Sequence, residues 1–114
     1  MSPRMPTFDP GDVVVVPFPF SDRAATKRRP ALVCSSSAFN NAAKHVVLAM
    51  ITSSAQHEWP GDVPIRDAGP TGLSAPSVVR WKFFTLDVSL VLRRAGALSA
   101  RDRAACLALH PVSL

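Results

Sequence analysis

One stretch of the sequence decides the fold, the run His45-Val-Val-Leu-Ala-Met-Ile-Thr52. Between its polar ends the run is wholly apolar, which predicts a central strand that is buried on both faces. Thr52-Ser53-Ser54 follows, so hydroxyl side chains are expected where the strand leaves the core. The segments on either side then decide what this strand pairs with.

Two further apolar runs precede the central strand, at residues 13–18 and 30–35. The first is rich in β-branched residues, and the prolines in and after it cannot donate to a strand ladder, which suits an edge or a bulge. Residues 21–29 lie between the runs, have no useful period and predict a long basic loop. Residues 38–44 predict a connection or a short helical turn.

The segments after the central strand predict shorter strands and one helix. Turn signals frame a short strand near residues 63–66, and residues 77–81 and 83–86 predict the last main strands or one bent strand. Residues 89–92 predict a short additional strand. The spacing Ser99-Ala-Arg-Asp102 is that of a capping box, which begins a terminal helix. Many short strands, no strand-helix alternation and one terminal helix predict a mostly β barrel or half-barrel with minor α structure.

Length and composition predict a single domain at residues 10–114, behind a flexible leader at residues 1–9. The chain has 114 residues, of which 47% are hydrophobic and 18% charged, so it is too apolar to be disordered and too short for a cofactor domain joined to a catalytic domain. No apolar run approaches the ~18 residues of a membrane helix. The leader has three prolines and no apolar core, which excludes a secretory signal and predicts a cytoplasmic protein.

Charge and motifs narrow the chemistry. Lysine and arginine total 13 against 8 acidic residues, a formal charge of +5 that favours polyanionic partners such as nucleic acid or an acidic protein. No phosphate-loop, dinucleotide, zinc-protease or nucleophile-elbow motif is present. Cys34 and Cys106 are far apart and predict buried thiols, while the three histidines lack ligand spacing and are expected at the surface or at strand ends. Neither a metal nor a cofactor is expected.

Basic and hydroxyl residues cluster at the predicted strand ends and suit a phosphodiester. They are Arg28 and Arg29, Thr52 with Ser53, and Arg80 with Lys82. Arginine offers a planar fork of donors to phosphate oxygens, and a threonine hydroxyl adds one more. The same residues also have structural readings, because Arg-Pro is a common loop exit and Thr-Ser-Ser often ends a strand.

Five segments in this order and spacing resemble the PemK/MazF family of toxin endoribonucleases, over roughly residues 10–110. They are Gly11-Asp-Val-Val-Val-Val-Pro-Phe-Pro-Phe20, Lys27-Arg-Arg-Pro-Ala-Leu-Val33, Ala49-Met-Ile-Thr-Ser53, Gly72-Leu-Ser-Ala-Pro-Ser-Val-Val-Arg80 and Phe84-Thr-Leu-Asp87. The resemblance implies an SH3-like barrel of the PemK/MazF/CcdB type with a C-terminal helix, and a homodimer that cleaves RNA without a metal. It also implies a cognate antitoxin with an acidic segment, with which such toxins bind DNA.

Residue by residue, the resemblance assigns Arg29 and Thr52 as the catalytic pair. It places Lys27, Arg28, Ser53, Arg80 and Lys82 among the RNA-binding residues. In one branch of the family a second arginine is followed two residues later by an aspartate, and the two take the acid and base roles. Arg80 matches that arginine, but Lys82 stands where the aspartate would be. The loop also departs from the pattern, because Ala-Thr-Lys-Arg replaces the acidic residue and glutamine that many members carry before Arg-Pro.

The predicted function is therefore the toxin of a type II toxin-antitoxin pair, which cleaves single-stranded RNA by attack of its own 2′-OH and inhibits growth. In this mechanism Arg29 stabilises charge and Thr52 donates to a nonbridging oxygen, while the general base is not identified. Trp81, Phe20 and Trp59 are candidates for stacking on bases, or else belong to the core or a dimer interface. Two alternatives stay open: a noncatalytic CcdB-like toxin that binds a topoisomerase, and an RNA-binding barrel that has lost cleavage.

Overall fold

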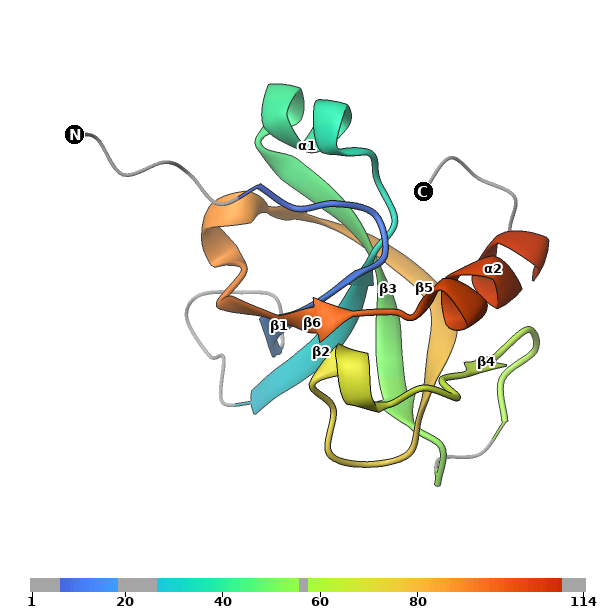
Figure 1. The fold of residues 1–114 in the computed structure, drawn as a ribbon. Coiled ribbons are helices and arrows are strands. Elements are labelled where there is room, and N and C mark those ends of the chain that lie inside the picture. Colours follow the sequence, from blue (N-terminus) through green and yellow to red (C-terminus); the bar gives the residue numbers. More distant parts are fainter. Residues whose placement is uncertain (1–6, 19–26, 56–57, 110–114) are drawn as a thin grey trace.

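A computed structural model describes residues 7–18, 27–55 and 58–109. Its elements are, in chain order, β1 (Asp12–Phe18), β2 (Lys27–Val33), α1 (Ser37–Ala43), β3 (His45–Ser53), β4 (Val63–Pro64), the 3-10 turn η1 (Gly69–Thr71), β5 (Ser77–Asp87), the 3-10 turn η2 (Val88–Leu90), β6 (Arg93–Ala97) and α2 (Ala100–Leu109) (Figure 1). No helix in these ranges is long and apolar enough to cross a membrane.

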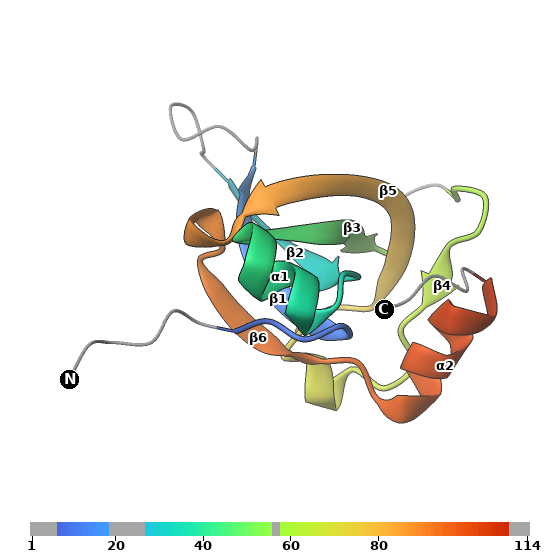
Figure 2. The same cartoon turned by 90° about the horizontal axis from the view of Figure 1, so that it is seen from above.

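The strands form one antiparallel sheet in the order β4-β5-β3-β2-β1-β6. β5 is long and bends in a wide arc, so the sheet curls into a half-barrel (Figure 2). The predicted mostly β half-barrel with a C-terminal helix is therefore confirmed, and residues 77–86 form one bent strand rather than two. β3 lies in the middle of the sheet between β2 and β5, as its continuous apolar sequence predicts.

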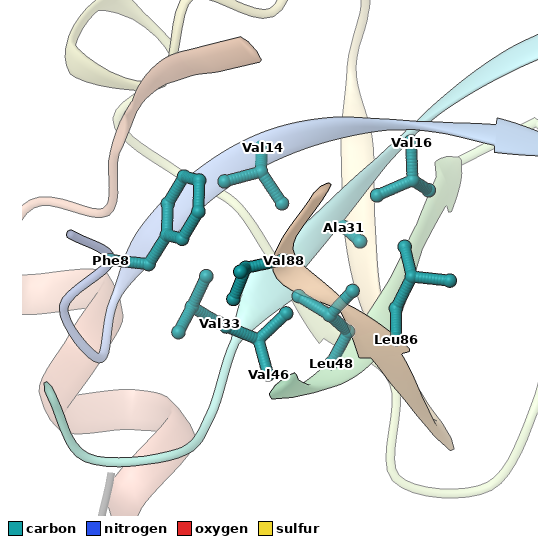
Figure 3. Packing of buried hydrophobic residues seen from close by; sticks show 9 residues of the cluster. All are labelled: Phe8, Val14, Val16, Ala31, Val33, Val46, Leu48, Leu86 and Val88. Atoms are coloured by element: carbon teal, nitrogen blue, oxygen red, sulfur yellow. The ribbon is translucent and has the colours of Figure 1, made fainter. Parts of the chain in front are cut away.

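The curled sheet is buried on both faces because neighbouring residues of its central strands point to opposite sides. One cluster, which we call the inner cluster, consists of Phe8, Val14, Val16, Ala31, Val33, Val46, Leu48, Leu86 and Val88 (Figure 3). The outer cluster consists of Val13, Leu32, Cys34, Ala49, Ile51, Val63, Val79, Leu98 and Cys106, and it includes a residue of α2. Both cysteines are free and buried, as predicted, and burial raises the pKa of the Cys34 thiol to about 12.

Three local predictions differ from the structure. Residues 27–29 belong to β2 rather than to the basic loop, because their pairing with β1 continues from Val16↔Arg29 to Phe18↔Lys27. The strand predicted at residues 89–92 is wrong: the Asp87 side chain accepts a hydrogen bond from the Ser89 backbone N–H (2.9 Å) and η2 forms there, so the last strand begins at Arg93. Phe8 lies within the flexible leader predicted for residues 1–9, but its side chain is only 4% exposed and packs in the inner cluster.

The capping box of α2 forms only in part. Ser99 Oγ accepts the Asp102 backbone N–H at 3.2 Å, as the spacing predicts. The buried Asp102 carboxylate accepts instead from the backbone N–H groups of Arg66 and Asp67, at 2.9–3.1 Å. Asp102 therefore ties α2 to the segment after β4, and these two lie side by side in both views (Figures 1 and 2).

Candidate active site

The inner face of the sheet changes from apolar to polar at one end of β2 and β3. Alternate residues of a strand share a face of the sheet. Arg29 therefore lies on the same face as Ala31, and Thr52 lies on the same face as Leu48 and Met50. Ala31 pairs with Met50, and a continuation of this register brings Arg29 and Thr52 to neighbouring positions two residues beyond that pair. The predicted catalytic residues thus lie together where the inner cluster ends.

A bulge in β5 brings Arg80 to the same place. Ala49 pairs with Phe83, but the next residue, Met50, pairs with Arg80, so Trp81 and Lys82 are two extra residues in β5. Without this irregularity Lys82 would stand opposite Met50. Bulges are a common means of re-aiming a side chain next to an active site. Here the bulge places Arg80 across from Met50, on the face that carries Thr52.

These side chains line one cavity of about 330 Å³. Its polar wall is formed by Arg29, Thr52, Arg80 and Lys82, and its apolar wall by Phe18, Met50, Phe83 and Phe84. We call it the cationic cavity. Four of the seven residues predicted from the sequence therefore converge, both of the proposed catalytic pair among them.

The Arg29 guanidinium contacts the Phe18 ring, and one of its N–H donors has no partner among the described residues. Its guanidinium Cζ lies 4.9 Å from the centroid of the Phe18 ring, a cation–π distance. Arg29 Nε is buried and has no hydrogen-bond partner among the described residues. A buried N–H without a partner is costly in a protein unless a ligand satisfies it. Arg29 lines the cationic cavity, and the described residues leave one of its donors unsatisfied.

Arg80 is buried and paired with a residue that sequence reasoning missed. Its Nε donates to Asp62 Oδ1 at 3.2 Å and its Nη2 to Asp62 Oδ2 at 2.9 Å. The hydrogen bond to Asp62 raises the pKa of Arg80, so the guanidinium is firmly charged. In the sequence Asp62 shows only as part of the turn signal Trp59-Pro-Gly-Asp.

Trp59 lies beside the two cations of β5. Lys82 Nζ is 4.2 Å from the centroid of its ring and Arg80 Cζ is 6.0 Å from it. Trp59 remains 40% exposed, whereas Trp81 packs against the outer cluster and contacts the Phe83 ring. Of the three aromatic candidates, Trp59 is thus the exposed one beside the site, Trp81 supports the core, and Phe20 lies outside the described residues.

The remaining predicted residues lie elsewhere. Arg28 lines a separate cavity of about 260 Å³, shared with Arg29 and with Arg93, which sequence reasoning did not single out. Lys27 is exposed at the start of β2. Ser53 points to the opposite face from Thr52, and its hydroxyl accepts the Ala55 backbone N–H at 3.2 Å. Ser53 therefore serves the end of β3 and does not line the cationic cavity.

Comparison with known families matches this architecture. A family model described as PemK-like, MazF-like toxin of type II toxin-antitoxin system covers residues 9–109. The chain belongs to this family. No protein of curated function matches the sequence significantly.

Solved structures with the same fold include MazF toxins. MazF in a MazE-MazF complex from Deinococcus radiodurans is 24% identical, with 90% of each chain covered and a TM-score of 0.68. The Mycobacterium tuberculosis toxin MazF-mt6 is 23% identical over 86% of this MazF-family chain and 90% of its own, with a TM-score of 0.68. A mycobacterial endoribonuclease in complex with its cognate antitoxin is 18% identical over 96% and 99%, with a TM-score of 0.66. At these identities the similarity shows that the fold is shared.

Proposed function

We propose that this MazF-family protein is a metal-independent, sequence-selective endoribonuclease that cuts single-stranded RNA in the cytoplasm and inhibits growth. One observation carries the proposal: Arg29, whose Nε has no partner in the described part of the chain, lines one cavity together with Thr52 and Arg80. This set of donors suits the nonbridging oxygens of a phosphate that gains charge in a transition state.

The proposed reaction uses the nucleophile of the substrate itself. The 2′-OH oxygen forms a bond to the adjacent phosphorus, the bond from phosphorus to the 5′ oxygen breaks, and a 2′,3′-cyclic phosphate remains. The 2′-OH proton leaves to a base, and the departing 5′ oxygen takes up a proton. Arginine stays protonated at neutral pH, so Arg29 stabilises the developing charge, and Thr52 donates to a nonbridging oxygen.

Single-stranded RNA suits the surroundings of the cavity. Trp59 and Phe83 are large exposed aromatic side chains beside the cations, 40% and 48% exposed. Unstacked bases bind readily to such rings, whereas bases in a duplex are already stacked and paired. A single strand also has the freedom to bring its 2′-OH in line with the scissile bond.

We expect the purified protein to cut a long RNA into discrete fragments in EDTA, because a 2′-OH nucleophile needs no metal-bound water. The fragments are expected to carry 2′,3′-cyclic phosphate or 3′-phosphate ends, which mass spectrometry identifies. A substrate with a 2′-deoxy sugar at the cleaved position is the control and stays intact. Complete dependence on added magnesium would reject the mechanism. Binding without cleavage would favour the RNA-binding barrel, and neither binding nor cleavage would favour the CcdB-like alternative.

We expect Lys82→Ala to weaken RNA binding far more than it slows cleavage. Lys82 is exposed and its ammonium lies over Trp59, so it offers a point charge to the RNA backbone. The RNA concentration for half-maximal single-turnover cleavage is expected to rise about 3- to 10-fold, with a maximal rate within about threefold of wild type. Arg80→Ala is expected both to weaken RNA binding and to lower the maximal rate. A Lys82→Ala rate that stays near zero at saturation would place Lys82 in the chemistry.

We also propose that the protein is a homodimer neutralised by an antitoxin whose acidic segment covers the cationic cavity. The exposed cations Lys27, Arg28 and Lys82 provide charge complementarity for such a segment. Light scattering tests the dimer, and a monomer at micromolar concentration would contradict it. Weakening of antitoxin binding by salt tests the charge contribution, and an affinity that ignores salt would contradict it.

A further inference from the structure

The carboxylate that pairs with Arg80 comes from outside β5. Lys82 occupies the position two residues after Arg80, so the strand places no carboxylate at that position. Asp62 instead reaches Arg80 from the turn before β4 and accepts from both Nε and Nη2. We infer that Asp62 is a positioning residue that holds the Arg80 guanidinium toward the cationic cavity; this inference rests on the proposed RNA cleavage.

The ion pair with Asp62 restricts the Arg80 side chain, which would otherwise sample many rotamers. An arginine side chain has many rotamers to lose, and a bidentate carboxylate sets both the direction and the plane of its guanidinium. The side chains of Arg80 and Asp62 are only 11% and 15% exposed, so water competes weakly for these bonds. A phosphate that enters the cavity then meets an arginine that is already oriented.

Hydrogen bonds to the Trp59 backbone fix Asp62 within its turn. Its Oδ2 accepts the Trp59 backbone N–H at 3.1 Å, and its own N–H donates to the Trp59 carbonyl at 3.1 Å. The Trp59 ring in turn lies 6.0 Å from Arg80 Cζ. Turn, carboxylate and guanidinium thus form one connected unit that ends at the cavity wall.

The geometry favours positioning over proton transfer by Asp62. Both of its oxygens already accept hydrogen bonds, and Asp62 lines a neighbouring cavity of about 640 Å³, on the side of Trp59. Arg80, by contrast, lines the cationic cavity directly. Asp62 therefore acts on a bound phosphate through Arg80.

This role has a signature that a loss of stability cannot imitate. Asp62→Asn removes one negative charge next to the cationic cavity, so RNA is attracted at least as strongly as before. The amide can no longer accept from both nitrogens of Arg80, so the guanidinium is less well oriented. The rate of cleavage and the affinity for RNA are thus expected to move in opposite directions.

The experiment compares Asp62→Asn, Asp62→Glu and a charge-matched control. Glu58→Gln changes the net charge equally, at an exposed carboxylate for which the described residues provide no ion pair. For Asp62→Asn we expect a maximal single-turnover rate about 10- to 100-fold lower, because misplaced groups cost about that much. Its Kd for an RNA with a 2′-deoxy sugar at the cleaved position is expected to be equal or lower. Asp62→Glu recovers part of the rate, and Glu58→Gln cleaves within twofold of wild type.

Two further readouts decide the outcome. The Arg80 Nε–Hε signal in proton–nitrogen NMR is expected to be sharp in wild type and lost in Asp62→Asn, whatever the activity. The pH profile of cleavage is expected to keep its shape in Asp62→Asn, and loss of a limb would make Asp62 the base and overturn the inference. A full rate in Asp62→Asn, or a rate and an affinity that fall together, would also overturn it. Wild-type protein that cuts no RNA rejects the proposed function itself.

Discussion

Arg29→Ala is expected to lower the maximal rate of single-turnover RNA cleavage by about 10²- to 10³-fold, the usual cost of removing one oriented donor to a developing oxyanion. The reason lies in its geometry: Arg29 Nε is buried without a partner in the described part of the chain, and the guanidinium is held over Phe18. The measurement is quenched-flow or gel-based cleavage with protein in excess over RNA.

The neighbouring residue offers a matched control for Arg29. Arg28 has the same charge but lines the cavity that it shares with Arg93, so Arg28→Ala is expected to weaken binding and leave the maximal rate within about threefold. Arg29→Lys keeps the charge and loses the planar fork, so its rate is expected to lie between those of wild type and alanine. A folded Arg29→Ala protein that cuts RNA at the wild-type rate would remove Arg29 from the site.

Gly96→Ala is expected to cause a large loss of stability for the addition of a single methyl group. A Cβ at this position of β6 would stand 2.1 Å from the Pro70 carbonyl oxygen and 2.7 Å from the Thr71 carbonyl carbon, and both are backbone atoms of η1. Neither can rotate away, so β6 and η1 must separate. Overpacking of this kind costs about 3 kcal/mol or more, a drop in Tm of roughly 10 °C or more for a domain of this size.

Gly69→Ala is the matched control for this substitution. Gly69 lies in η1 itself, but an added Cβ there has nothing within 4 Å. Its Tm is expected to stay within about 2 °C of wild type, since surface substitutions change stability by about ±0.5 kcal/mol. Thermal unfolding followed by circular dichroism measures both variants. Equal melting temperatures for Gly96→Ala and wild type would show that β6 and η1 do not pack as described.

The sequence predicted the strands best where one local pattern was continuous. The apolar composition of β1 and β3 predicts that these strands are buried, because a strand covered on both faces has apolar side chains on both of its faces. The prediction was less accurate where a side chain redirects the backbone. Asp87 forms a turn at residues 88–90 and so shifts the last strand to Arg93, and no period reveals such a turn.

Period-two alternation along the sequence also indicates which residues of β2 and β3 face the cationic cavity. Arg29 lies two residues before the apolar Ala31 and Thr52 two residues after Met50, and period-two alternation then puts both on the face of the inner cluster. The same rule sends their neighbours Arg28 and Ser53 to the other face, which the grouping by strand ends did not take into account. Alternation is a property of the strand alone, so it can be read without knowing the partner strand.

The ion pair between Arg80 and Asp62 could be found only from the tertiary structure. The two extra residues of β5 set Arg80 opposite Met50, and Asp62 reaches Arg80 from a turn 18 residues earlier. Both depend on how far the sheet curls and on where β4 adds to β5, because a bulge and a cross-turn ion pair are relations between segments. No pattern within one segment contains them, so the sequence left Asp62 as an ordinary turn residue.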